Sequence, residues 1–176
     1  WNSHKVHENQ TKAGFGEDSR RVYITYSDDD GKTWAKAKDI TRSTKQKHWS
    51  WYATGPGAGI QLQRGKHKGR LIIPCDHKSL PAGGPQTYHS HILYSDDHGE
   101  TWHAGAQTGH GLNECEAVEL ENGDVMLNSR NHGIDEFHRG VSISKDGGQT
   151  FSSFRRDPTL LEPRCQASIR RYRWST

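Results

Sequence analysis

Hydrophobic residues along the chain fall in short runs, and each run ends at a cluster of Asp, Gly or Asn residues. The runs are rich in β-branched and aromatic side chains, which is typical of strands that stop at turns. No segment shows the spacing of a long amphipathic helix. The pattern predicts an all-β fold, with strands in the ranges 22–26, 60–62, 70–75, 88–94, 115–120, 125–129 and 139–143.

Three of these runs lead into the phrase Ser-x-Asp-x-Gly-x-Thr-aromatic, at residues 27–34, 95–102 and 144–151. Such recurrence indicates an array of similar supersecondary units. In each copy we expect Asp to accept hydrogen bonds from nearby backbone N–H groups, Gly to adopt a positive φ, and the aromatic ring to pack over the turn. A calcium loop is the alternative. The first copy lacks a Glu at the twelfth loop position and the third has fewer acidic residues, so a structural turn is favoured.

Residues 57–105 and 113–154 each read as four short strands, the fourth opening at Thr101 or Thr150. In the second unit Asn122-Gly123 is a strong hairpin signal. Four antiparallel strands per unit predict the blades of a β-propeller.

The ends of the chain are predicted to belong to two further blades. Residues 1–37 read as the later strands of an earlier blade, and residues 165–176 as the start of the next, with 166–173 as its first strand. A propeller removes its open sheet edges and covers its blade faces only when the ring closes. We therefore expect a fragment of a single propeller domain, or a partner surface that supplies the remainder.

Composition narrows the class of protein. The chain has 176 residues, a net charge of +3 and 30% hydrophobic residues. Basic residues are mixed with acidic ones, which argues against a nucleic-acid partner, and no apolar run is long enough for a membrane span. The three cysteines form no Cys-x-x-Cys pair, so we expect small strand residues rather than a zinc or redox site. The first residues lack the features of a signal peptide and look like the interior of a longer chain.

Three stretches carry a resemblance to a known family: 51–62, which reads Trp-Tyr-Ala-Thr-Gly-Pro-Gly-Ala-Gly-Ile-Gln-Leu; 113–130, which begins Asn-Glu-Cys-Glu and ends Leu-Asn-Ser-Arg; and 163–168. The repeated phrase looks like the Asp-box, or BNR repeat. Together these features resemble the sialidases (neuraminidases) of the bacterial and animal exo-α-sialidase type over nearly the whole chain. The resemblance implies a partial six-bladed propeller with its site on the central axis, sialylated glycans as partners, no metal or organic cofactor, and a secreted or periplasmic location.

By resemblance, Glu114 matches the catalytic Glu of the family and Arg130 matches the second of three substrate-binding arginines. The first arginine and an Asp acid/base belong upstream in the family pattern, and the third arginine and a nucleophilic Tyr belong downstream. None of these can be assigned here, and the N-terminal Arg-Ile-Pro motif is absent. We expect a retaining exo-α-sialidase as the full-length protein and an inactive isolated fragment.

The chemistry of sialic acid explains why these residue types are needed. The sugar carries a carboxylate on its anomeric carbon, and a bidentate guanidinium such as Arg130 matches that planar anion. A carboxylate nucleophile would be repelled there, and sialidases use Tyr instead. The phenol needs a neighbouring base, for which Glu114 is the candidate, kept ionised by Arg130.

Several alternatives stay open from the sequence. Glu116 and Glu119 compete with Glu114; in a strand Glu116 shares its face and Glu119 points oppositely. Trp51 and Tyr52 either line the sugar pocket as substrate-binding residues or pack between blades. One of Tyr88, His89 and His91 could reach the sugar, although strand packing is favoured. A non-catalytic propeller that binds carbohydrate or protein, and a trans-sialidase, are the alternative functions.

Overall fold

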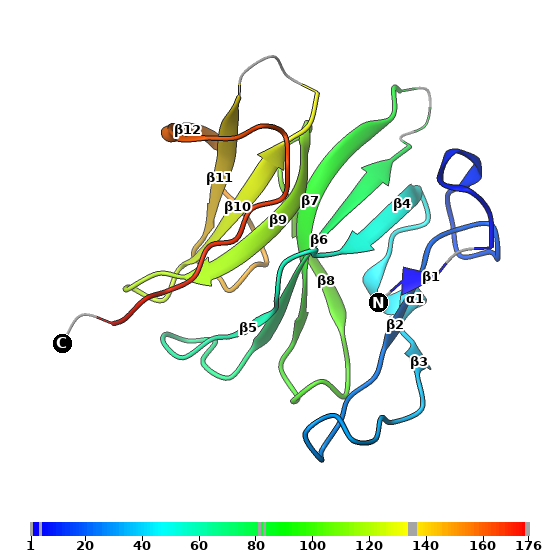
Figure 1. Cartoon of the computed structure of the whole chain (residues 1–176), viewed down its shortest axis with the longest axis horizontal. Helices are drawn as coiled ribbons and strands as arrows, with labels where there is room; N and C mark the ends of the chain where they lie inside the picture. The colour runs from blue at the N-terminus through cyan, green and yellow to red at the C-terminus, as the bar shows by residue number, and fades with distance from the viewer. Residues whose placement is uncertain (1, 4, 81, 83, 134–136, 175–176) are drawn as a thin grey trace.

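The structure is a computed structural model and describes residues 2–3, 5–80, 82, 84–133 and 137–174. Within these residues the chain forms three separate antiparallel sheets, which confirms the all-β prediction (Figure 1). Helical structure is limited to the short segments η1 (Glu8–Gln10) and α1 (Thr41–Thr44) in the described part. No helix among these residues is long and apolar enough to cross a membrane.

A four-stranded sheet contains three of the strands predicted for the unit 113–154, but its fourth strand lies at Arg155–Leu161, beyond the predicted end, and does not open at Thr150. Its strands lie in the order β12-β11-β10-β9, and every neighbouring pair is antiparallel. The Asn122-Gly123 turn joins β9 to β10 as the sequence predicts, and Gly123 has a φ of 85°. The strands are β9 (Leu112–Glu119), β10 (Val125–Asn131), β11 (His138–Ser144) and β12 (Arg155–Leu161).

A five-stranded sheet corresponds to the predicted unit 57–105, with one strand more than expected. The additional strand β4 (Trp49–Thr54) pairs with one half of β6 (Leu71–Ser79), and β5 (Ile60–Gln61) pairs with the other half. β4 and β5 therefore act as one strand that the Gly- and Pro-containing segment 55–59 interrupts. Beyond β6 the sheet continues with β7 (Thr87–Ser95) and β8 (His103–Gln107).

The N-terminal part forms the third sheet, in the order β1-β2-β3. Its strands are β1 (Asn2–Ser3), β2 (Arg21–Ile24) and β3 (Lys38–Asp39). Val22 of β2 packs with Trp49 and Tyr52 of the five-stranded sheet in one buried cluster. The N-terminal sheet thus covers one side of its neighbour.

The repeated phrase has the same hydrogen bonds in all three copies. In the second copy Asp97 accepts from the Thr101 N–H at 2.9 Å, and Ser95 Oγ accepts from the Gly99 N–H at 2.8 Å. Asp29 and Asp146 accept the corresponding bonds at 2.8 Å in the other copies. The glycines that recur in the three copies, Gly31, Gly99 and Gly148, have φ values of 80°, 94° and 94°, as predicted for residues that need a left-handed backbone. These bonds hold each Asp within its own turn.

The aromatic residue at the end of the repeat is buried to a different extent in each of the three copies. Trp102 is buried and donates its indole N–H to the Gly99 carbonyl, so this ring covers its turn as expected. Phe151 is half-buried against the core between the two larger sheets. Trp34 also lies over its turn, since a Cβ atom on Gly31 would be 3.9 Å from its ring, but the outer side of this ring is open and the residue is 64% exposed.

The prediction of a strand at residues 166–173 is also wrong. This segment forms no strand; it crosses β9 as an extended coil (Figure 1). Its arginine side chains contact β9, in place of the backbone hydrogen bonds of a strand. Arg170 forms an ion pair with Glu116, and Arg171 Nε donates to the Glu119 carbonyl at 2.8 Å. The guanidinium groups of Arg64 and Arg171 both contact the Trp174 ring, 4.0 and 4.3 Å from its centre.

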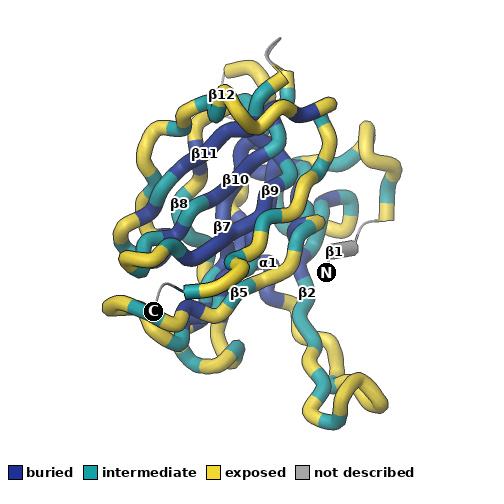
Figure 2. The backbone as a smooth tube through the Cα atoms, turned by 60° about the vertical axis from the view of Figure 1, so that its left-hand side comes forward, coloured by how far each residue is buried: buried dark blue, intermediate teal, exposed yellow. Residues whose placement is uncertain are grey.

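The two larger sheets pack face to face along a seam, which Figure 2 shows as buried strands between exposed loops. Its apolar core joins Ile72 and Ile92 of one sheet to Ala117 and Leu127 of the other. Hydrogen bonds cross the seam as well, from the Ala106 N–H to the Gly148 carbonyl at 3.0 Å and from the Ser90 hydroxyl to the Asn113 carbonyl at 2.5 Å. The sheets are therefore fixed relative to each other by directional contacts as well as by burial.

A group of buried rings fills the other side of the five-stranded sheet. Trp49 stacks on His77 at 3.6 Å between ring centres, and His77 Nδ1 lies 3.0 Å from His91 Nδ1. His91 Nε2 in turn lies 3.0 Å from the Tyr52 hydroxyl. Burial, with a smaller contribution from His89, lowers the pKa of His91 to about 3, and burial lowers that of His77 well below 6.5. Both imidazoles are neutral in the folded chain near neutral pH.

This arrangement predicts acid destabilisation. The unfolded chain takes up protons on these histidines as pH falls through about 6.5, whereas the folded chain resists protonation of His91 down to about pH 3, so stability decreases over that window. Urea unfolding at pH 7 and pH 5 should show a smaller loss of stability in His91→Gln than in the unsubstituted protein. His103→Gln, at an exposed position, serves as the control. Equal losses in His91→Gln and the unsubstituted protein would contradict the account.

Candidate functional site

A cavity of about 350 Å³ opens where the five-stranded and four-stranded sheets meet. Strands β4, β6 and β7 supply residues from one sheet, and β9 and β10 supply residues from the other. Its lining residues are Glu8, Trp51, Ala53, Thr54, Pro56, Asp76, Tyr88, Asn113, Glu114, Arg130 and His132. The polar side chains on its walls come from strands far apart in the sequence, which only the packing of the sheets brings together.

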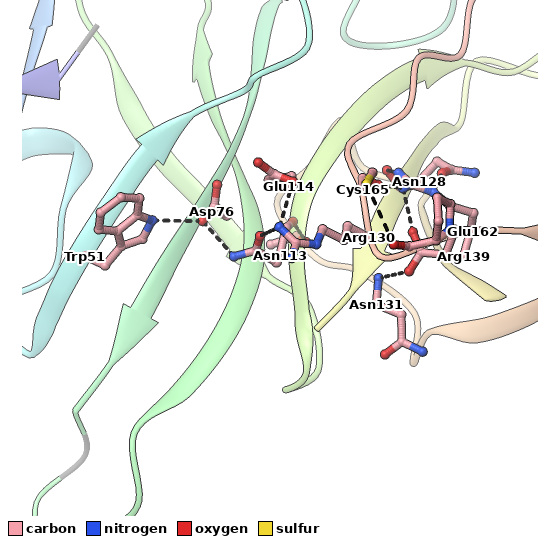
Figure 3. Close-up of polar contacts among 12 residues, drawn as sticks. Trp51, Asp76, Asn113, Glu114, Asn128, Arg130, Asn131, Arg139, Glu162 and Cys165 are labelled. Atoms are coloured by element: carbon pink, nitrogen blue, oxygen red, sulfur yellow. Dashed lines mark hydrogen bonds and ion pairs between the residues drawn. The ribbon is translucent and has the colours of Figure 1, made fainter. Parts of the chain in front are cut away.

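Glu114 and Arg130 face each other in this cavity (Figure 3). Arg130 Nη1 lies 2.9 Å from Glu114 Oε2, and the two side chains are 23% and 30% exposed. The same Nη1 lies 3.4 Å from Asn113 Oδ1. The structure therefore brings together the two residues that the sequence analysis selected, in a position open to a ligand.

A bulge in β10 positions Arg130. The register with β9 shifts between Ser129 and Asn131, so Arg130 lies at the irregular position, and bulges commonly redirect a side chain in this way. The strand is held on both sides of the bulge by a buried ion pair. Glu162 accepts from the Asn131 N–H at 2.6 Å and pairs with Arg139 at 2.8 Å, and Arg139 Nε donates to Asn128 Oδ1 at 2.6 Å (Figure 3).

The competing glutamates have structural partners. Glu116 is buried, accepts from the Ala58 N–H at 3.2 Å and forms the ion pair with Arg170. A Cβ atom at Gly57 would lie 1.6 Å from Glu116 Oε2, so only glycine allows this approach. Glu119 accepts from the N–H groups of Gln63 and Arg64, both at 2.8 Å. Of the three glutamates, Glu114 alone lines the cavity.

Trp51 lines the cavity, whereas Tyr52 does not. The Tyr52 side chain is fully buried on the opposite face of β4, where its hydroxyl contacts His91 and donates to the Thr44 carbonyl at 3.3 Å. Adjacent residues of a strand point to opposite faces, so only one of the pair can reach the cavity. The expectation that Tyr52 lines the sugar pocket is therefore corrected: it packs between the N-terminal and five-stranded sheets.

Of the three β7 residues considered for the pocket, one lines the cavity and two are buried away from it. Tyr88 lines the cavity, and its ring contacts His132 with 4.1 Å between ring centres. His89 and His91 are buried away from it, as strand packing predicts. The sequence analysis gave no role to His132, which follows β10 directly. Its distance from Arg130 along the strand was the available signal, since residues two apart share a face.

Asp76 was missed entirely by the sequence analysis. It lies in the middle of β6, is 1% exposed, and accepts from Trp51 Nε1 at 3.2 Å and from Asn113 Nδ2 at 3.0 Å (Figure 3). Burial raises the pKa of its carboxyl to about 7, and the Glu114 charge acts in the same direction. The available signal was a charged residue directly after the apolar run Leu71-Ile72-Ile73-Pro74-Cys75, because a buried Asp is uncommon without a specific environment.

The cavity thus combines a guanidinium, an accessible carboxylate and aromatic walls. Such a set can bind an anionic group through the guanidinium and accept a proton on the carboxylate. In the described part of the chain, no group of three or more His, Cys, Asp or Glu side chains could hold a metal ion.

Comparison with known proteins gives consistent similarities. Residues 4–169 match the family profile described as BNR repeat-like domain. A sialidase of Micromonospora viridifaciens is 37% identical over 146 residues, which are 83% of this chain and 22% of that protein. The chain spans less than half the length of the curated relatives it matches first.

Solved structures show the same similarity. The Hadza microbial sialidase Hz136 superposes with a TM-score of 0.77 at 30% identity, over 89% of this chain and 29% of that one. The leech intramolecular trans-sialidase, complexed with 2,7-anhydro-Neu5Ac, gives a TM-score of 0.68 at 25% identity, over 82% of this chain and 20% of that one.

The raised pKa of Asp76 predicts an opposite pH effect to that of the histidines. The folded chain keeps a proton on Asp76 between about pH 4 and pH 7 that the unfolded chain releases, so this group lowers stability as pH rises through that window. Relative to Asp76→Asn, the unsubstituted protein should lose about 1 to 4 kcal/mol between pH 5 and pH 8, because one pKa unit corresponds to about 1.4 kcal/mol. Urea unfolding checks this, with exposed Asp28→Asn as control. Parallel stability curves for Asp76→Asn and the unsubstituted protein would contradict it.

Proposed function

The chain belongs to the sialidase family, and on this premise we propose that it carries part of the active site of a retaining exo-α-sialidase. The proposed reaction releases terminal sialic acid from glycoproteins, glycolipids or oligosaccharides. The observation that carries the proposal is the pair formed by Glu114 and Arg130, 2.9 Å apart on the wall of one cavity.

Arg130 is the proposed binding group for the sugar carboxylate. Its guanidinium is partly exposed to the cavity and held by Glu114 and Asn113, so it presents fixed N–H donors to an incoming anion. Charge-assisted bonds of this kind are shorter and stronger than neutral ones and match a planar carboxylate. Trp51 supplies an apolar wall for the uncharged parts of the sugar, and its ring is itself covered by Arg20 at 4.0 Å.

Glu114 is the proposed general base for a tyrosine nucleophile. By family resemblance that tyrosine lies outside this chain, as does the acid that protonates the leaving oxygen. Glu114 takes the phenol proton, the phenolate oxygen bonds to the anomeric carbon, and the bond to the leaving glycan oxygen breaks as that oxygen gains a proton. Water then cleaves the tyrosyl intermediate, so two inversions give net retention. Since the remaining catalytic groups are expected elsewhere, the isolated chain should be inactive.

The proposed domain organisation follows from the same premise. We assign residues 57–105 and 113–154 to two blades of one six-bladed β-propeller, residues 1–37 to the preceding blade and residues 165–176 to the start of the following one. The five-stranded and four-stranded sheets support the two complete blades, and their shared seam supports a site near the axis of the ring.

A trans-sialidase is the second candidate, favoured by the likeness to the leech intramolecular trans-sialidase. The two reactions share the binding and nucleophilic steps and differ in what accepts the sialyl group. Analysis of the products separates them, since hydrolysis yields free sialic acid and transfer yields a new glycoside or an anhydro sugar. A non-catalytic propeller would bind the glycan and yield neither product.

Kinetics of the intact protein with a fluorogenic sialoside test the proposal. Glu114→Ala should lower kcat by about 10² to 10⁴, the usual contribution of a general base. Arg130→Ala should raise KM and lower kcat, because the anion contact tightens in the transition state. Glu100→Ala, at an exposed turn, is the matched control and should behave like the unsubstituted enzyme. Unchanged turnover in Glu114→Ala would remove this residue from the mechanism.

A further inference from the structure

Asp76 is the one buried carboxyl on the described wall of the cavity, and the proposed reaction gives it no role. Its Oδ2 accepts two hydrogen bonds, from the Trp51 indole and the Asn113 amide, whereas its Oδ1 is buried with no hydrogen-bond partner among the described residues. A buried oxygen without a partner is costly as part of a carboxylate, since the charge is then incompletely solvated. A neutral carboxyl with its proton on Oδ1 costs less in this position than a carboxylate, because only the carboxylate leaves a buried charge.

A continuous chain of contacts joins Asp76 to the ion pair. Asn113 Nδ2 donates to Asp76 at 3.0 Å, and Asn113 Oδ1 lies 3.4 Å from Arg130 Nη1, which itself lies 2.9 Å from Glu114 (Figure 3). The side-chain amide of an asparagine can flip, which exchanges its oxygen and nitrogen, at little cost in free energy unless the two atoms have different hydrogen-bond partners. Asp76 supplies the acceptor that holds the Asn113 nitrogen, and thereby directs the Asn113 oxygen towards Arg130.

The charge state of Asp76 then matters for an anionic ligand. Glu114 already places one negative charge next to Arg130, and the pair is close to neutral as a unit. An ionised Asp76 would add a second negative charge in a site with restricted solvent, where like charges repel strongly. This excess negative charge would repel a sugar carboxylate that binds to Arg130 and would weaken its binding.

From these contacts we propose that Asp76 is a positioning residue for Arg130, acting through Asn113, and that it must be protonated for an anionic sugar to bind. The inference rests on the proposed function for the nature of the ligand. The inference goes beyond the proposed function because it concerns Asp76, which in the proposed reaction contacts neither the reacting atoms nor the sugar carboxylate. The site would therefore bind its ligand together with a proton held on Asp76.

The other titratable groups around Asp76 are the alternative source of a pH dependence of anion binding. Charged or titratable groups face it from every neighbouring element: Glu114 on β9, Arg130 on β10, Tyr88 on β7, His132 after β10, Glu8 in η1, and the buried Tyr52, Cys75 and Cys115. Burial raises the pKa of both thiols and of the Tyr52 phenol, and burial lowers the pKa of His132. Burial raises the pKa of Asp76 to about 7, so this carboxyl titrates within the neutral range.

The test compares two variants with opposite consequences. Asp76→Asn keeps an oxygen that accepts from Trp51 and Asn113 and has no charge to gain, so it mimics the protonated carboxyl. Asp76→Leu has similar bulk but removes the acceptor, which frees the Asn113 amide. Thermal unfolding establishes that each variant is folded, and the surface variant Asp28→Asn controls for loss of a charge.

The measurement is equilibrium binding of an unreactive sialic-acid analogue to the intact protein at pH 6, 7 and 8. In the unsubstituted protein the dissociation constant should rise about tenfold for each pH unit above the Asp76 midpoint, because the competent fraction falls in that proportion. In Asp76→Asn it should stay nearly constant from pH 6 to pH 8. In Asp76→Leu it should already be about tenfold weaker at pH 6.

Two results would overturn the inference. If the unsubstituted protein and Asp76→Asn lose affinity equally above pH 7, the proton does not reside on Asp76. If Asp76→Leu binds as tightly as Asp76→Asn at pH 6, the contact through Asn113 does not position Arg130. Neither result bears on the Glu114→Ala kinetics, so this inference can fail while the proposed function stands.

Discussion

The fixed packing of two sheets across one seam is the constraint on which the site depends. Glu114 and Arg130 belong to one sheet, and Trp51, Asp76 and Tyr88 belong to the other, so the cavity exists only while the sheets keep their relative position. The seam is closed by a shared apolar core and by hydrogen bonds that cross it. Glu116 and Glu119 strengthen it by accepting from the N–H groups of residues 58, 63 and 64 across the interface. Two of the three glutamates on β9 are thus structural, and this leaves Glu114 free to face the cavity.

The orientation of Arg130 results from the bulge in β10 and from the buried ion pair that holds the strand on both sides of it. The β10 bulge turns the residue out of the regular ladder, and the buried pair of Arg139 and Glu162 binds the strand at Asn128 and Asn131 on either side. Both members of this pair also form hydrogen bonds with the strand, from the Asn131 N–H to Glu162 and from Arg139 to the Asn128 side chain and carbonyl, and these fix the two flanks of the bulge. A flexible, exposed arginine would lose more side-chain entropy on binding an anion.

The sequence predicted the parts of the fold that local chemistry determines. The turn bonds of Asp29, Asp97 and Asp146 follow from side-chain reach and glycine geometry, and the structure confirms them. The error at residues 166–173 arose because the place of a segment in a series of blades does not say which partner it will find; its arginines pair with Glu116 and with the end of β9 instead. Tyr52 and Asp76 were misjudged for a related reason. Whether a side chain faces a cavity or a core depends on the position of the next sheet, which no local pattern contains.

The central claim is that Arg130 offers its guanidinium to the carboxylate of a bound sugar. The most direct measurement compares the binding of a sialic-acid analogue with that of its uncharged methyl ester, for the intact protein and for Arg130→Met. The account predicts that the acid binds at least about tenfold more tightly than the ester in the unsubstituted protein, since each 1.4 kcal/mol of charge-assisted bonding is a factor of ten. It also predicts that this preference shrinks sharply in Arg130→Met. An undiminished preference for the acid in that variant would show that the anion binds elsewhere.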